Sequence, residues 1–350
     1  MAAIDVIVAP ALTPDIVLGL ELHFLEAVVT RRTAPLLLIY ATPGRRVSIG
    51  RYHLYAGAAE RSEIHASRRL TGGRVVGAGD GWLCLALILP TRDALLKMDV
   101  AAGLKPDQVM NRYVRGLLAG LRSLKLNCFY PGRDAITFDQ REIAMCSYEI
   151  DASGAMLFEA VLAVSRGMEE LVHDLERIDP DGALACPMYG SDDATTVARE
   201  LGREIGFGEL ADTIAAGYGF LLGGIERREL TAREVAEGER RGRELADSRW
   251  LNRLVANPSQ RLKNRIASQL GAIEAAVELN DDGTIASATL AGDYIANSAA
   301  IAELENELRG RRLDLPSISQ AVTKTFGHGP NFILGAGELS NLVRLVAGVN

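Results

Sequence analysis

The stretch ASRRLTGGRVVGAGDGW, residues 66–82, constrains this chain more than any other. It places two adjacent arginines before a glycine pair and continues with Gly77, Gly79 and Gly81. A P-loop requires a glycine followed by lysine and then serine or threonine, and no lysine lies nearby. A dinucleotide-binding turn requires GxGxxG between a strand and a helix, whereas this GxGxG leads into the strand-like run WLCLALILP. The sequence therefore excludes both nucleotide-binding motifs.

Two interpretations of this stretch remain. Glycine tolerates positive φ and lets the backbone approach a ligand closely. Arg68, Arg69 and Arg74 offer forked donors that suit a carboxylate or a phosphate. The alternative is a glycine-rich hairpin that carries solvated arginines. These residues alone do not decide between the two.

Length and charge limit the class of protein. The chain has 350 residues, which exceeds the size at which one core usually stops growing, so we expect a large domain plus a smaller one. Its hydrophobic content of 48% and charged content of 24% are those of a globular protein. A net charge of −7 argues against broad electrostatic binding to nucleic acid.

Cysteine spacing and the N-terminus indicate the compartment. Cys84, Cys128, Cys146 and Cys186 form no CxxC pair and no regular spacing, which suits reduced thiols rather than a disulfide framework or a zinc site. The N-terminus lacks the pattern of a signal peptide, and no apolar run is long enough to span a membrane. We therefore predict a soluble cytoplasmic protein with no membrane partner and no nucleic-acid partner.

The first part of the chain alternates helical and strand patterns. Residues 14–31 and 105–126 each carry an apolar stripe at helical spacing. Short apolar runs bounded by turn residues predict strands, and they fall at 34–42, 45–55, 82–90, 135–138, 141–150 and 155–164. This order predicts an α+β fold with a mixed sheet and packed helices.

The second part becomes helical and then changes composition. TARE at 231–234 has the form of a capping box and predicts a long charged helix that runs toward Trp250. The run NPSQRLKNR at 257–265 is polar and predicts a linker.

The C-terminal part has its own pattern. Residues 280–283, Asn-Asp-Asp-Gly, join two strand-like runs and predict a hairpin, which a helical pattern follows. We therefore predict a first domain over 1–250 and a small α+β domain over 251–350.

At this point the motifs resemble a known family. RRLTGG, preceded by SIGRYH at 48–53, is similar to the two ligand loops of the lipoate-protein ligases, whose catalytic domain is shared with biotin ligases and octanoyltransferases. The similarity continues in order through the segments 131–144, 230–250 and 292–295. It implies a biotin/lipoate ligase-like mixed sheet with packed helices and an accessory C-terminal domain.

The resemblance also implies a reaction. Family ligases use ATP and magnesium to activate lipoate or octanoate as an acyl-adenylate. They then transfer the acyl group to a lysine of a lipoyl-carrier domain, as in the 2-oxoacid dehydrogenases, or of the glycine-cleavage H protein. By this resemblance, the small acyl or carboxylate ligand binds at Arg68, Arg69, Thr71, Gly72 and Gly73, with Arg69 pointing inward.

Two further positions follow from the resemblance. Asp134 falls where the family approaches metal or nucleotide, and His53 falls where relatives carry a polar amide near the ligand. The sequence assigns no set of metal ligands.

One departure concerns the charge of the site. The family carries a lysine that bridges the acyl carbonyl and the phosphate, and Glu142 occupies that position here, with Met145 at the position of a family glycine. Two unit charges about 4 Å apart interact by roughly 4 kcal/mol at an effective dielectric near 20. Each step of about 1.4 kcal/mol changes a rate tenfold, so Glu142 opposes ordinary ligase chemistry.

Substitutes for this lysine are few. Arg141 is adjacent to Glu142, but neighbouring residues of a strand point to opposite faces unless a bulge intervenes. Cys128 lies close to where amidotransferase-type relatives carry a nucleophilic cysteine, and a thiol in that role needs a lowered pKa or a nearby base. Glu159 is a further departure, because the family often has a small or imidazole group there.

Three hypotheses therefore stay open. The first is an acyl ligase or transferase in which Arg141 or Cys128 replaces the lysine. The second is a catalytically inactive relative that binds a small acyl or carboxylate ligand as a sensor or assembly partner. The third is an enzyme for a different substrate, in which Glu142 and Glu159 receive a cationic group or a metal.

Overall fold

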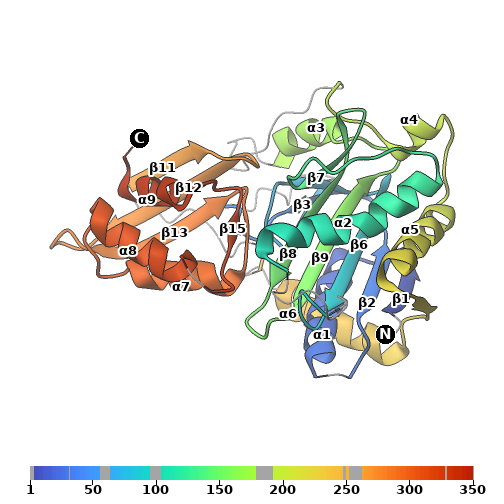
Figure 1. Ribbon diagram of the computed structural model, residues 1–350, viewed down its shortest axis with the longest axis horizontal. Coiled ribbons are helices and arrows are strands. Elements are labelled where there is room, and N and C mark those ends of the chain that lie inside the picture. Colours follow the sequence, from blue (N-terminus) through green and yellow to red (C-terminus); the bar gives the residue numbers. More distant parts are fainter. Residues whose placement is uncertain are drawn as a thin grey trace.

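A seven-stranded mixed sheet forms the centre of the molecule (Figure 1). The computed structural model describes residues 4–30, 32–55, 64–94, 104–178, 192–246, 250–251, 262–327 and 329–349. In spatial order the strands are β10 (Ile225–Arg227), β1 (Ile4–Ala9), β2 (Leu36–Tyr40), β6 (Trp82–Leu89), β9 (Met156–Ala163), β8 (Arg141–Ile150) and β7 (Ala135–Phe138). The first three strands run parallel and the remaining pairings are antiparallel.

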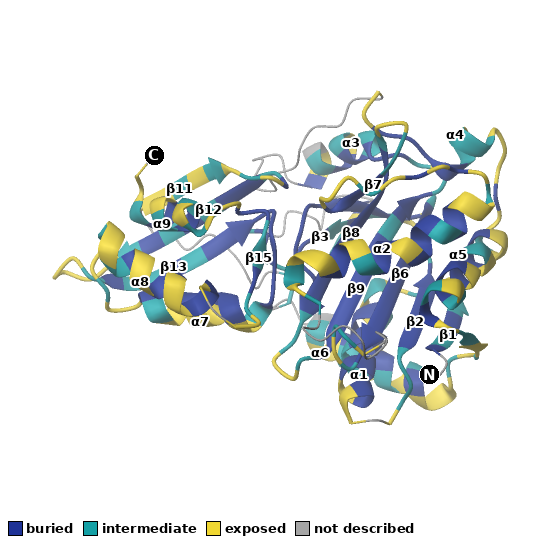
Figure 2. Cartoon of the chain, viewed as in Figure 1, coloured by how far each residue is buried: buried dark blue, intermediate teal, exposed yellow. Residues whose placement is uncertain are grey.

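Helices cover both faces of this sheet. One face carries α2 (Pro106–Ser123) and α5 (Phe207–Leu222), which share a core with the sheet through Tyr113, Leu117 and Tyr218. The other face carries α1 (Pro14–Val29) and, outside it, α6 (Ala232–Ala246). Figure 2 shows the strands buried and the outer sides of these helices exposed. The site lies on the α1 face.

Glycines allow α1 and α6 to pack closely. A Cβ on Gly19 of α1 would lie 2.0 Å from the carbonyl oxygen of Gly238 in α6, so only glycine fits there. The capping box predicted at the start of α6 is present, because Thr231 and Glu234 exchange hydrogen bonds between side chain and backbone. Pairs such as Arg240 with Glu244 lie along its exposed side.

A small sheet lies beside the α1 face. It consists of β3 (Arg45–Ile49) between β4 (His65–Arg68) and β5 (Val76–Gly79), and α3 (Glu169–Ile178) packs on it. The RRLTGG segment runs from the end of β4 to the start of β5. This position explains why the segment can reach both the main sheet and the C-terminal part.

The C-terminal part has a separate core. The sheet β11 (Leu262–Ala267), β12 (Ala272–Leu279) and β13 (Ile285–Gly292) packs against α7 (Ser298–Leu308), α8 (Leu315–Phe326) and α9 (Leu339–Ala347). A short pair, β14 (Ile295–Ala296) with β15 (Ile333–Leu334), lies next to the first part. The remaining helix, α4 (Val197–Leu201), precedes α5.

Most of the predicted elements are present, and the α+β fold is confirmed. The hairpin turn at 280–283 closes with a hydrogen bond from the amide of Asn280 to the carbonyl oxygen of Thr284. The predicted polar linker is wrong for 262–265, because these residues belong to β11, an edge strand whose polar side chains face solvent. Residues 252–261, which include the rest of that linker and adjoin the predicted domain boundary, lie outside the described residues.

No helix within the described residues is long and apolar enough to cross a membrane.

Candidate functional site

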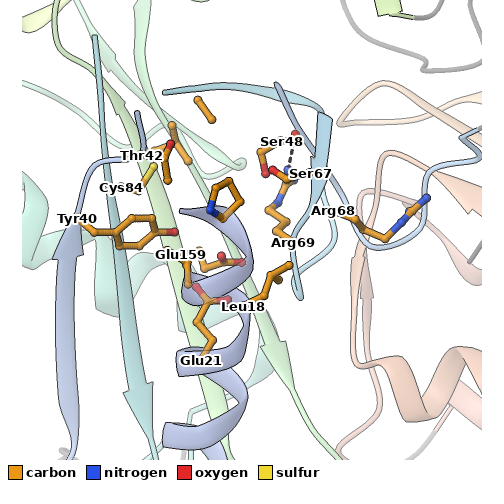
Figure 3. Close-up of a pocket in the computed structure, with 14 residues that line it drawn as sticks. Leu18, Glu21, Tyr40, Thr42, Ser48, Ser67, Arg68, Arg69, Cys84 and Glu159 are labelled. Carbon is orange, nitrogen blue, oxygen red and sulfur yellow. Dashed lines mark hydrogen bonds between the residues drawn. The ribbon is translucent and has the colours of Figure 1, made fainter. Parts of the chain in front are cut away.

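The two adjacent arginines point in different directions (Figure 3). Arg68 is almost fully buried and donates to the carbonyl oxygens of Gly50, Arg51 and Leu251 at 2.9 Å each. In return, the indole of Trp250 donates to the carbonyl oxygen of Arg68. Arg68 therefore connects the GRYH segment to the chain beyond α6.

Arg69 is the inward arginine, as the resemblance implied. Its guanidinium donates to the carbonyl oxygens of Ser48, Gly72 and Arg74, and to the hydroxyl of Thr71. Most of the hydrogen bonds that its N–H groups donate are therefore accepted by backbone carbonyl oxygens. In this structure Arg69 holds the RRLTGG loop in shape.

Arg74 forms a buried charge cluster with two carboxylates. Its guanidinium donates to both oxygens of Asp134, at 2.8 and 3.0 Å, and lies 3.1 Å from Glu142 Oε2. All three side chains are at least nine-tenths buried. Glu142, which the resemblance places where the family carries a lysine, therefore has a cation beside it that comes from the RRLTGG side of the site.

A bulge in β8 orients Glu142. Ala144 pairs with Ile136 of β7, but Glu142 pairs with the very next residue, Thr137, so Ile143 has no partner across the ladder. The extra residue changes which face the following side chain occupies. Arg141 instead forms an ion pair with Glu200 at 3.0 Å. The irregularity thus turns Glu142 toward Arg74 and leaves Arg141 outside this cluster.

The environment changes the proton affinity of Glu142. Burial raises the pKa of Glu142 from 4.5 to about 7, the carboxylate of Asp134 adds to the rise, and Arg74 opposes it. The net charge of the cluster therefore changes near neutral pH.

The glycine pair of the loop contacts the C-terminal part. The amide of Gly73 donates to the carbonyl oxygen of Tyr294 at 2.7 Å, and a Cβ on Gly72 would lie 2.3 Å from the same oxygen. Tyr52 stacks on Tyr294 and donates to the carbonyl oxygen of Ala296 at 2.9 Å. The backbone that lies too close to these positions for any residue but glycine therefore belongs to the C-terminal part of the chain.

His53 takes part in the same contact. Its Nδ1 accepts from the amide of Gly50 at 3.1 Å, so Nε2 carries the proton and lies 2.9 Å from Asp293 Oδ1. His53, for which the resemblance implied a place near the ligand, is thus bonded to Asp293 within the GDYI segment.

Cys128 lies apart from this cluster. It packs in the apolar core on the α2 side of the main sheet and is 2% exposed. Burial raises the pKa of its thiol from 9.0 to about 12, whereas a nucleophilic thiol needs a lowered pKa. The structure does not bring Cys128 to Arg74, and its proposed catalytic role gains no support from this geometry.

A second acidic group was missed by the sequence analysis. Glu21, from the buried side of α1, lies against Glu159 of β9, and both are at least nine-tenths buried. Thr71 donates its hydroxyl to Glu159. A sequence signal for Glu21 exists: it stands three residues after Leu18 and four before Leu25, on the buried side of the helix.

Three cavities follow one another on this face. The innermost, of about 50 Å³, is lined by Glu21, Tyr40, Thr42 and Glu159 among others (Figure 3). The middle cavity, of about 20 Å³, is lined in part by residues that also line the innermost one: Arg69, Glu159 and Val161. Arg74 lines both the middle cavity and an open cleft of about 810 Å³. The cleft is lined by residues of both parts of the chain, from Asp134 and Glu142 to Ser268 and Gly271. The RRLTGG loop thus separates a buried acidic pocket from a large polar cleft.

The residues of the cleft limit how a metal could bind. In the described part of the chain, no three His, Cys, Asp or Glu side chains come together to hold a metal ion. Magnesium is commonly held by one or two carboxylates together with substrate phosphates. Asp134 and Glu142 fit that arrangement with a nucleotide in the cleft, and they do not fit a site made by protein ligands alone.

This architecture is that of the lipoate-protein ligases. The P. falciparum protein LipL1 in complex with lipoate aligns with a TM-score of 0.71 and 12% identity, over 98% of this chain and 99% of that one. The ligase of a bipartite lipoylation system from Thermoplasma acidophilum, determined with its E2 lipoyl domain, aligns with a TM-score of 0.54 and 16% identity, over 73% of this chain and 98% of that one.

A third structure, lipoate-protein ligase A bound with ATP, aligns with a TM-score of 0.51 and 18% identity, over 73% of this chain and 100% of that one. No protein-family model matches the chain, and comparison with curated protein sequences gives no significant match. At these identities the likeness confirms the expected fold, while the roles of individual residues stay predictions.

Proposed function

We propose that this protein activates a small carboxylic acid with ATP and transfers the acyl group to a lysine of a lipoyl-carrier domain. The substrate carboxylate would attack the α-phosphate of ATP and displace pyrophosphate. The lysine amine would then attack the acyl carbonyl and release AMP. In this proposal the nucleotide lies in the cleft at Arg74, and the acyl chain extends past Arg69 toward Glu159.

The observation that carries this proposal is the position of Arg74. A cation lies beside the position where the family has its lysine, at the junction of the open cleft and the inner cavities. Two further features support it. The likeness to the lipoate-bound LipL1 extends over both parts of the chain. The ATP-bound and E2-domain-associated relatives suggest ATP as co-substrate and a lipoyl domain as acceptor.

The charge balance gives a condition for this activity. Arg74 is already paired with Asp134 and Glu142, so a phosphate gains less from it than from an unpaired lysine. Protonation of Glu142, whose pKa is about 7, removes one of the two negative charges. Magnesium bound with the nucleotide would screen the other.

The test is the intact mass of an apo lipoyl domain after incubation with the protein, magnesium-ATP and an acid. Lipoate and octanoate are the first acids, and a known ligase serves as the positive control. We expect an acyl adduct on the domain and release of pyrophosphate, with both lost in Arg74→Gln and kept in Arg115→Gln, an exposed arginine of α2. Absence of pyrophosphate with every acid tried would contradict the proposal.

A second candidate is a non-catalytic binding protein. The observation that favours it is the same cluster, because Arg74, Asp134 and Glu142 already satisfy one another. In that case an acid would bind and shift the melting temperature without any release of pyrophosphate.

A further inference from the structure

The innermost cavity contains polar atoms that the protein does not satisfy. Neither oxygen of Glu21 receives a hydrogen bond from an N–H or hydroxyl group of the described chain, and the hydroxyl of Thr42 has no partner. All three atoms belong to residues that line the same cavity. A buried polar group without a partner destabilises the fold, and a charged one does so more strongly.

The two carboxyls of the cavity both favour the protonated form more than a carboxyl in water does. Burial raises the pKa of Glu21 well above its ordinary value, and the charge of Glu159 adds to the rise. Burial also raises the pKa of Glu159, against the nearby charge of Arg69. Two carboxyls in contact cannot both ionise cheaply.

Two arginines line this cavity, and the hydrogen bonds that the structure gives them go to groups other than the acidic pair. Arg68 points away from Glu159 (Figure 3) and donates to the carbonyl oxygens of Gly50, Arg51 and Leu251. Arg69 donates to three carbonyl oxygens and to Thr71. The other titratable groups that face the pair are Tyr40 and Cys84, and burial raises the pKa of both. Among the described residues, Glu21 and Glu159 therefore have no cation hydrogen-bonded to them.

One wall of the cavity is apolar, whereas Ser48 and Ser67 contribute hydroxyl groups elsewhere in the lining. Pro14, Val17 and Leu18 of α1 face Ala78 and Val161 across the cavity. Such a wall suits the methylene groups of an aliphatic chain. The lining thus combines an apolar channel with an acidic end.

We propose that this pocket binds the ammonium end of an aliphatic chain, so that the acid used by this protein is an ω-amino carboxylic acid. An ammonium group has three N–H donors, and Glu21, Glu159 and Thr42 offer acceptors around one cavity. This inference rests on the proposed function for the carboxylate end. The pocket itself is argued from its own residues.

The cavities give the path for such a molecule. Glu159 and Arg69 line both inner cavities, and Arg74 lines the middle cavity and the cleft. Arg74 and Glu159 line the same middle cavity, so a short aliphatic chain can extend from the one side chain toward the other. An extended amino acid chain would place its ammonium at the acidic pair and its carboxylate toward Arg74.

Calorimetric titration of the full-length chain with n-butylammonium, n-butanol and n-butyrate tests the pocket without ATP. We expect only butylammonium to bind, at least tenfold more weakly to Glu21→Gln and unchanged to Glu26→Gln, an exposed glutamate of the same helix. A bound ammonium favours the ionised form of the carboxyls, so titration in buffers of different ionisation enthalpy should show proton release on binding, and Glu21→Gln should reduce that release. Butanol or butyrate binding as tightly as butylammonium, or an unchanged affinity in Glu21→Gln, would overturn the inference.

A second assay separates this inference from the proposed function. Pyrophosphate release is compared for 6-aminohexanoate and hexanoate with magnesium-ATP. A higher kcat/KM for 6-aminohexanoate that is lost in Glu21→Gln supports the inference. A preference for hexanoate would overturn it while the proposed function stands. Butylammonium binding without pyrophosphate from any acid would support the pocket and contradict the proposed function.

Discussion

Two buried acidic clusters lie on the same side of the main sheet, and they differ in their cations. Asp134 and Glu142 enclose the guanidinium of Arg74, which bonds to both. Glu21 and Glu159 face a cavity with no cation bonded to either of them among the described residues. The first cluster is complete without a ligand, whereas the second is not.

This difference distinguishes buried acidic residues that stabilise the fold from those that are available to bind a ligand. A buried ion pair satisfies itself, and removing one partner leaves an uncompensated charge. A buried acid that lacks donors lowers stability, and such a residue persists where a ligand uses it. The two clusters should therefore respond in opposite directions when one member is removed.

The largest expected effect is the loss of Arg74. Arg74→Ala leaves Asp134 and Glu142 buried without their cation, and we expect the free energy of unfolding to fall by about 3–5 kcal/mol. Urea unfolding at pH 7.5 measures it. Arg133→Ala, in the same cleft but exposed, should change stability by less than about 0.5 kcal/mol. A loss for Arg74→Ala as small as that of this control would mean that the cluster is not buried as described.

A smaller effect concerns the pH dependence that Glu142 imposes. Its folded-state pKa of about 7 lies above the ordinary 4.5, so between these values the folded state holds a proton that the unfolded chain has lost. Stability is therefore highest below pH 4.5 for this group and falls as pH rises toward 7, by up to about 3 kcal/mol.

Glu142→Gln should remove the part of the pH dependence of stability that comes from this carboxyl. The measurement is urea unfolding at pH 5.5 and 7.5 for the wild type, Glu142→Gln and the exposed control Glu239→Gln. The difference in the free energy of unfolding between pH 5.5 and pH 7.5 should become smaller only in Glu142→Gln. An unchanged slope in that variant would place the titration elsewhere, for example at Glu149, whose pKa burial also raises to about 7.

The smallest expected effect has the opposite sign. Glu21→Met removes a carboxyl that no donor satisfies and fills similar space, so we expect the free energy of unfolding to rise by about 1–3 kcal/mol at pH 7.5. The gain should shrink as pH falls, because burial raises the pKa of both carboxyls and protonation removes their charge. Glu26→Gln should leave stability unchanged in the same experiment, and a loss of stability in Glu21→Met would remove the contrast between the two clusters.

Much of the fold follows from local patterns in the sequence. Helix α2 shows this clearly, because Val109, Tyr113, Leu117 and Leu121 recur at helical spacing and all are fully buried. The turn at 280–283 and the capping box at Thr231 depend on neighbouring residues only, so both were predictable. Strand β11 was not, since its polar residues gain order from pairing with β12, which the local composition does not reveal.

The site was only partly predictable for the same reason. The inward direction of Arg69 followed from the RRLTGG motif, but its acceptors are carbonyl oxygens whose positions depend on the folded loop. A bulge in this strand would be needed to bring Arg141 inward. The structure has a bulge at Ile143, but there Glu142 points inward and Arg141 pairs with Glu200. Glu21 escaped notice because its partner, Glu159, lies on a distant strand.

The sequence by itself determined the order of helices and strands, the shape-forming motif at Arg68–Gly73 and the change of charge at position 142. These depend on the types and spacing of nearby residues, which set backbone preference and apolar periodicity. Only the tertiary structure decided that Arg74 compensates Glu142 and that Glu21 meets Glu159 without a cation bonded to either. Charge balance depends on distances between residues far apart in the chain, and packing of the elements sets those distances.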